Sequence, residues 1–224
     1  MRLLRDAAHP SADGARVAAC GPLVADGPLL AAPMTGRPCV TYKYEVTTRS
    51  SQRRLSVTCD GYALTPCHVD TPGGSIRILG YTDFRFSPET PSGPDAESRM
   101  REYLAGTTLT PHGLTAGRAF LAMLADEDGA IRADFGTSPA LDAAGFIEYA
   151  VADREEVCAF GTYSADRGGL VPGPGSVDAY PVSLRRGSAA RIRRSFLTGA
   201  AGYLGLAAFL AALGAVAAWL LTRL

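Results

Sequence analysis

The chain has 224 residues, of which 47% are hydrophobic, and its 22 basic and 22 acidic side chains give a formal net charge of zero. That length accommodates about one ordinary domain together with short additional segments. Residues 1–184 carry 16 of the basic and all 22 of the acidic side chains. A mildly acidic domain argues against nucleic-acid binding, which requires a basic face.

The first half of the chain predicts a flexible arm followed by strands. Residues 1–14 show no periodicity and are expected to be the arm. Short apolar residues at 15–24 predict a strand that breaks at Gly21-Pro22. Residues 39–47 alternate between apolar and polar side chains, which predicts a half-buried strand with one buried and one solvent-exposed face. Residues 55–58 predict another strand.

The middle of the chain predicts a hairpin, a helix and a second hairpin. Apolar residues 62–69 and 76–79 flank the turn residues Thr71 to Gly74. Residues 96–105 predict a short helix with Met100, Tyr103 and Leu104 on one face. The start of residues 119–136 is also compatible with a helix, but turn residues 126–129 favour a hairpin there. Residues 138–145 predict one helical turn.

The last part of the domain predicts three more strands, at 146–151, 156–161 and 177–184, with a glycine-rich loop at 168–175 between the last two. Many short strands and few helices predict a mainly β fold, antiparallel and of the α+β type with one or two short helices, over residues 15–184.

Three stretches together resemble one family. Residues 32–46 combine Ala-Pro, Thr-Gly and a cysteine with an aromatic, alternating strand, residues 64–84 form a Pro-Gly-Gly hairpin, and residues 146–161 form a strand pair joined by an acidic turn. This pattern is similar to the GIDE-type domain, also called BAM ("beside a membrane"), of organellar ubiquitin ligases and bacterial membrane proteins. The resemblance implies a membrane-associated β domain. The chain lacks the C-x-x-C pairs of the ligases' RING module, so ligase activity is not implied.

The end of the chain predicts a membrane anchor. Residues 195–222 contain no charge over 28 positions, and a helix of that length reaches about 42 Å, enough to span a bilayer. Residues 185–194 form a basic collar expected to contact lipid headgroups through Arg185, Arg186, Arg191, Arg193 and Arg194. Because these arginines precede the span, the positive-inside rule places the domain in the cytoplasm. Small residues at three-residue steps favour self-association of this transmembrane helix.

The potentially reactive side chains do not form a recognisable catalytic or metal motif. A reducing cytoplasm predicts that all five cysteines are free thiols. Cys59, Cys67 and His68 lie close together but lack a fourth zinc ligand, so we predict no metal and no cofactor. The best candidates for binding a partner are Arg37, Cys39, Tyr42 and Tyr44.

We therefore predict a single-pass, membrane-anchored, non-catalytic domain that binds a protein or organises a membrane complex. The alternative is an enzyme or enzyme subunit, either related to ubiquitin ligases or dependent on the thiol of Cys39 or Cys67. Thiol chemistry would require a depressed thiol pKa.

Overall fold

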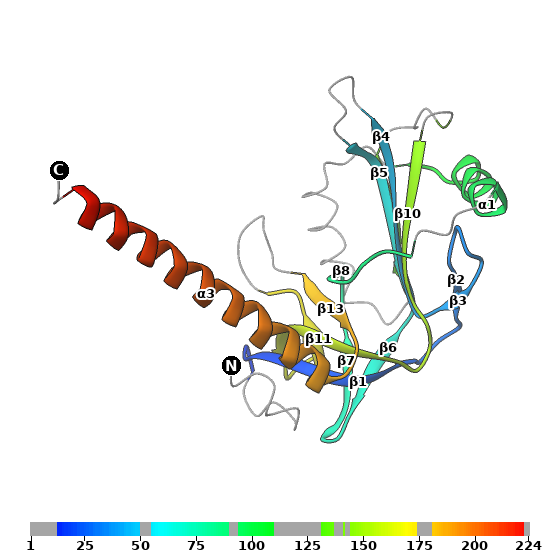
Figure 1. Ribbon diagram of the computed structural model, residues 1–224. Coiled ribbons are helices and arrows are strands. Elements are labelled where there is room, and N and C mark those ends of the chain that lie inside the picture. Colours follow the sequence, from blue (N-terminus) through cyan, green and yellow to red (C-terminus); the bar gives the residue numbers. More distant parts are fainter. Residues whose placement is uncertain are drawn as a thin grey trace. The chain divides into compact units, whose positions relative to one another are not determined.

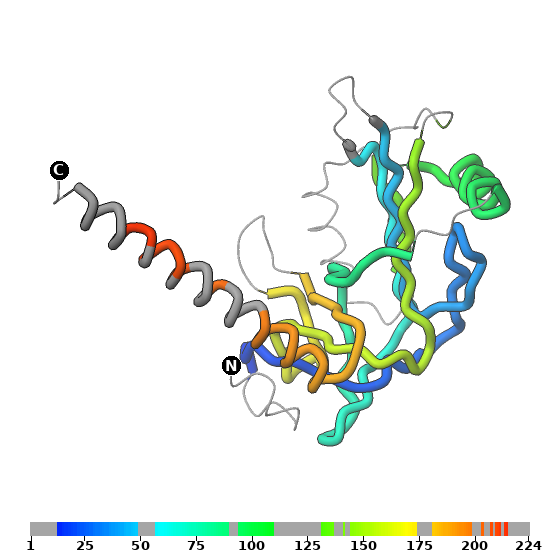
Figure 2. Tube along the Cα trace, in the orientation of Figure 1, coloured from blue at the N-terminus to red at the C-terminus, as the bar shows by residue number. Residues whose placement is uncertain are grey.

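The structure is a computed structural model, which describes residues 13–49, 55–89, 94–109, 131–136, 141, 144–173 and 181–221 (Figure 2). The chain divides into two units, Met1–Ser188 and Ala189–Leu224, and each is described by itself. The predicted arm, most of the predicted 119–136 hairpin and most of the predicted helical turn at 138–145 lie outside the described residues.

The first unit is a mainly β domain, as predicted, with one described α-helix, α1 (Pro94–Ala105) (Figure 1). Its strands are β1 (Arg16–Ala25), β2 (Leu30–Ala31), β3 (Pro38–Cys39), β4 (Thr41–Arg49), β5 (Leu55–Leu64), β6 (Cys67–Thr71), β7 (Gly74–Ile78), β8 (Thr82–Phe84), β9 (Ile131–Gly136), β10 (Ala144–Val151), β11 (Glu155–Ser164), β12 (Gly169–Val171) and β13 (Val182–Arg186).

Five strands close into a small barrel. The ring runs β1–β6–β7–β12–β11 and closes because β1 also pairs with β11, while β13 and β8 continue the sheet outside the ring. β1 pairs with β11 from Arg16 to Leu23 and with β6 from Leu23 to Ala25. The prediction that this strand breaks at Gly21-Pro22 is wrong. A side chain on Gly21 would collide with the backbone oxygen of Asp70, so the glycine serves close strand packing.

The second sheet has four antiparallel strands in the order β10–β4–β5–β9. On one face, Tyr42, Tyr44 and Val46 pack with Met100 and Leu104 of α1. The other face contributes side chains such as those of Tyr62 and Leu64 to the core of the barrel. The prediction of a wet face on β4 is therefore wrong. Thr41 is 1% exposed and Lys43 is 7% exposed because the barrel covers them.

The remaining strands agree with the antiparallel prediction except at two places. The 71–74 turn joins β6 to β7 as predicted, and β10 and β11 contain the predicted strands at 146–151 and 156–161. β12 pairs with β7 and β13 pairs with β8 in parallel. β12 lies inside the segment predicted to be a loop, because Gly169 allows its backbone to approach Arg77 of β7 closely.

The described part of the second unit is a single helix, α3 (Ala189–Leu221), of 33 residues. It starts six residues before the predicted span, so Arg191, Arg193 and Arg194 lie inside the helix rather than in a collar before it. Among the residues that the structure describes, no helix has the length and apolar character needed to cross a membrane. The prediction of a C-terminal transmembrane helix is therefore wrong.

The cysteines also differ from the prediction. Cys20 of β1 lies directly opposite Cys158 of β11 in the strand register, and the two form a disulfide. The prediction of five free thiols fails for this pair because the register brings together two residues that are 138 positions apart in the sequence. Cys39, Cys59 and Cys67 are free and buried.

Candidate functional site

The segment that precedes β4 is held in place by a buried carboxylate. Glu148 of β10 is 1% exposed. Its Oε2 accepts a hydrogen bond from the backbone N–H of Met34 at 2.6 Å, and its Oε1 accepts one from the Thr35 hydroxyl at 2.8 Å. Sequence reasoning missed this residue. The available signal was that Glu148 shares a strand face with the apolar residues Phe146 and Ala150.

Three of the four predicted partner-binding residues are buried. Tyr42 is 3% exposed, and Cys39 and Tyr44 are fully buried. The Tyr44 hydroxyl donates to Asp134 Oδ1 at 2.6 Å, and the Tyr103 hydroxyl of α1 donates to the same oxygen at 3.0 Å. Burial raises the pKa of Tyr42 and Tyr44, and their hydrogen bonds and the Asp134 charge add to the effect. The hydroxyl groups of Tyr42 and Tyr44 thus link the sheet to Tyr103 of α1, directly for Tyr42 and through Asp134 for Tyr44. Both side chains are buried within the domain.

Arg37, the fourth predicted residue, is exposed and belongs to a line of alternating charges. Its Nη2 lies 2.8 Å from Glu89 Oε2, and Glu89 Oε1 lies 2.7 Å from Arg186 Nη1. Arg186 Nε in turn lies 2.6 Å from Glu155 Oε1. Burial raises the pKa of Glu89, but the two arginines outweigh it and hold that pKa below its usual range.

The five arginines predicted to contact lipid headgroups belong to two different elements. Arg185 and Arg186 belong to β13, whereas Arg191, Arg193 and Arg194 belong to α3. The guanidinium of Arg186 also lies over the ring of Phe86, 4.5 Å from its centroid. Arg186 is therefore part of the domain's packing.

The free thiols are in environments that suppress their reactivity. Burial raises the pKa of Cys39 to about 12, with a further contribution from Glu148. Burial likewise raises the pKa of Cys59 to about 12 and that of Cys67 further still. Since the thiolate is the nucleophile, such thiols react slowly at neutral pH.

His68 lies between two carboxylates. Its Nδ1 is 2.7 Å from Asp26 Oδ1, and its Nε2 is 3.2 Å from Asp70 Oδ1. The two ring nitrogens point in different directions, so the carboxylates do not converge on one point. Over the described ranges, no group of three or more His, Cys, Asp or Glu side chains is placed to hold a metal ion.

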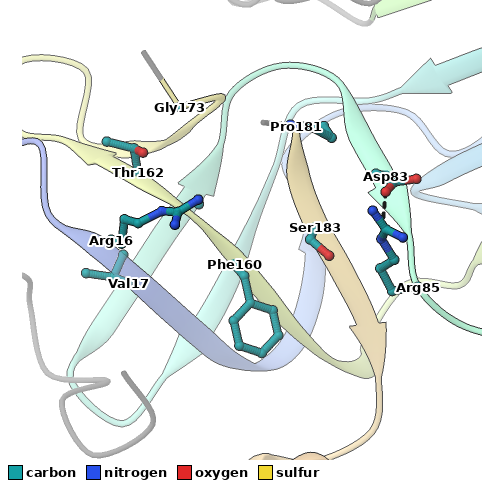
Figure 3. A pocket seen from close by; sticks show the side chains of 10 residues that line it. Arg16, Val17, Asp83, Arg85, Phe160, Thr162, Gly173, Pro181 and Ser183 are labelled. Carbon is teal, nitrogen blue, oxygen red and sulfur yellow. Dashed lines mark ion pairs between the residues drawn. The ribbon is translucent and has the colours of Figure 1, made fainter. Parts of the chain in front are cut away.

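A hollow of about 210 Å³ lies on the outer face of the sheet formed by β1, β11, β13 and β8. Phe160 and Ser183, which are register partners on β11 and β13, lie in its middle. Arg16 of β1 is on one side, and Asp83 and Arg85, at the end of β8, are on the other (Figure 3). We call this feature the barrel-face hollow. Sequence reasoning missed it because its residues come from four separate strands.

The chemistry of the hollow combines an apolar floor with charged edges. Arg85 Nε lies 2.7 Å from Asp83 Oδ2, and the Arg85 side chain is 60% exposed. The floor is backed by barrel residues such as Val182 and Leu184, which are fully buried. Such an arrangement can bind a side chain that has both apolar and polar parts.

The comparisons with known proteins do not place the chain in a family: no protein-family model, no curated protein and no solved structure matches it.

Proposed function

We propose that the chain is a non-catalytic domain that binds a protein partner. The observation that carries this proposal is the barrel-face hollow, an apolar depression with charged edges on a closed and well-packed barrel. Rigid scaffolds with a concave apolar surface and a few polar groups at its edge are typical binding surfaces. The resemblance to GIDE-type domains remains a prediction and is consistent with this class of function.

The alternative of a thiol-dependent enzyme is less well supported. It requires an exposed cysteine with a depressed pKa. Cys39 and Cys67 are buried and have raised pKa values. We expect iodoacetamide at neutral pH to label the native protein slowly at all three free thiols. Rapid labelling of either Cys39 or Cys67, followed by mass spectrometry, would revive the enzyme hypothesis.

A photocrosslinking experiment tests the binding proposal. Ser183, in the hollow, and Ser98, on the exposed face of α1, are each replaced by benzoylphenylalanine in the full chain. We expect a discrete crosslinked protein from position 183 and not from position 98. The product should disappear when Phe160→Ala is added. Identical products from both positions, or a product that Phe160→Ala leaves unchanged, would contradict the proposal.

A further inference from the structure

We infer that the Cys20–Cys158 disulfide is a reversible redox switch, which an external dithiol opens by attacking Cys20 and which loosens the closure of the barrel when it opens. The inference goes beyond partner binding, because it concerns what keeps the barrel closed. It follows from the place of the bond in the barrel, from the different burial of its two cysteines and from the environments of the other three.

The disulfide crosses the seam that closes the barrel. β1 and β11 complete the ring of five strands, in a register that runs from Arg16 opposite Thr162 to Leu23 opposite Glu155. Among the described strands, β6 pairs with β1 only over residues 23–25, so residues 16–22 pair with β11 alone. The disulfide is the covalent link within this stretch. Breaking it leaves residues 16–22 paired to the sheet on one side only.

The two cysteines of the bond differ in burial. Ala19 and Val157 belong to the core of the barrel. Because successive side chains of a strand point to opposite faces, Cys20 and Cys158 lie on the outer face of the seam. Cys20 is partly exposed there, whereas Cys158 is fully buried. An incoming thiol therefore reaches Cys20, and exposed disulfides are the ones that exchange readily.

The other cysteines do not compete for redox reagents. All five cysteines lie within the described residues, and Cys39, Cys59 and Cys67 are free and buried. Burial raises the pKa of Cys39 and Cys59 to about 12 and that of Cys67 further still, which keeps them as unreactive thiols at neutral pH. Cys20 is therefore the cysteine at which thiol–disulfide exchange enters the chain.

Opening the bond takes two exchange steps. A thiolate of the dithiol attacks Sγ of Cys20, the bond to Cys158 breaks, and Cys158 Sγ leaves with the electron pair and takes a proton from water. The second thiol of the reagent then displaces Cys20 from the mixed disulfide, and Cys20 Sγ is protonated in turn. The reagent ends as a disulfide, oxidised by two electrons, and the protein ends with two thiols. A disulfide reagent closes the bond by the reverse sequence.

The rate of reduction in the native protein is the first test. The full wild-type chain is treated with dithiothreitol at urea concentrations well below the unfolding midpoint, and the loss of the disulfide is followed by quenching and mass spectrometry. If the reagent reaches Cys20 in the folded barrel, the rate should change by less than about twofold over this range. A rate that rises about tenfold or more per molar of urea would show that the bond opens only in unfolded chains, and would overturn the inference.

Two single variants test which sulfur is attacked. Native Cys158→Ser, incubated with oxidised glutathione, should gain one glutathione, which peptide mapping should place on Cys20. The matched variant Cys20→Ser should gain none. An adduct on Cys158 that forms as fast as the one on Cys20 would contradict the assigned point of attack. Thermal unfolding checks that both variants fold, and the urea experiment on wild type decides the question if either does not.

Hydrogen exchange tests whether the seam responds to the switch. On reduction, amides in residues 16–22 should lose protection by at least about tenfold more than those of β4 in the second sheet. An equal loss in both segments would mean that the bond stabilises the domain as a whole, and an unchanged seam would mean that the bond does not hold it. Either result would overturn the switch.

Discussion

Removing the Cys20–Cys158 disulfide should destabilise the domain strongly. The bond joins β1 to β11 and closes a loop of 138 residues. In the chain-entropy description, a cross-link over a loop of that length lowers the entropy of the unfolded chain enough to stabilise the fold by about 5 kcal/mol at 25 °C. Measured losses for native disulfides are about 2–5 kcal/mol, so we expect the double variant Cys20→Ala/Cys158→Ala to lose an amount in this range.

Urea unfolding under oxidising and reducing conditions measures this effect. For an m-value of about 2–3 kcal/mol/M, the midpoint should fall by about 1–2 M in the double variant. The same fall should follow reduction of the wild-type protein. Reductant should not change the double variant, which makes that variant the control for other effects of the reagent.

A count of thiols in denaturant gives an independent check. Without reductant, three thiols per chain should react, because Cys39, Cys59 and Cys67 are the free cysteines. With reductant, all five should react. Five reactive thiols without reductant, or a wild-type midpoint that reduction leaves unchanged, would refute the reasoning.

The other predictions concern groups buried within the domain or paired at its surface. Glu148→Gln leaves one of the two donors without its acceptor and should lower the free energy of unfolding by about 1–3 kcal/mol in urea titrations; a loss below about 0.5 kcal/mol would show that the segment does not depend on this carboxylate. Gly61→Ala places a methyl group 2.2 Å from Tyr44 Cε1 and should cost about 1–3 kcal/mol, whereas Gly106→Ala, whose methyl group would meet no atom closer than 3.7 Å, should not. Glu89→Gln should lower the free energy of unfolding by less than about 1 kcal/mol at pH 7, because the ion pairs of Glu89 with Arg37 and Arg186 are partly exposed. The folded pKa of Glu89 is depressed, so its contribution is fully present above the unfolded value of about 4.3 and is lost as pH falls through the lower folded value. The wild-type and Glu89→Gln unfolding curves should therefore converge in acid, and a difference that persists there would exclude this ion pair as its source.

The elements that the sequence could predict are those whose signal is local. Alternation identified β4, turn residues identified the β6–β7 hairpin, and spacing placed Met100 and Leu104 on the buried face of α1. Each of these depends on residues only a few positions apart.

The features that could not be predicted depend on contacts between distant parts of the chain. Alternation on β4 assigned Lys43 to a wet face, but nothing in that strand shows that a barrel covers it, with its Nζ 2.5 Å from Glu45 Oε1. The sequence suggested that the strand ends at Gly21, but β1 continues through it. Because Gly21 has no side chain, the backbone of Asp70 can approach it closely. The barrel-face hollow is formed by the register of four strands, so no single stretch of sequence contains it.

The closure of the barrel by β1 has a consequence for how the chain folds during synthesis. β1 is made before the other described strands, yet its main partner β11 begins at Glu155. At about 5–20 residues per second, a ribosome takes roughly 7–30 s to add the 138 residues that lead from Cys20 of β1 to Cys158 of β11. During that interval β1 has an unpaired edge, and pairing over such a distance is intrinsically slow once it becomes available. The nascent chain is therefore most exposed to misassociation before β11 emerges, and a chaperone that binds extended apolar segments would act at residues 16–25.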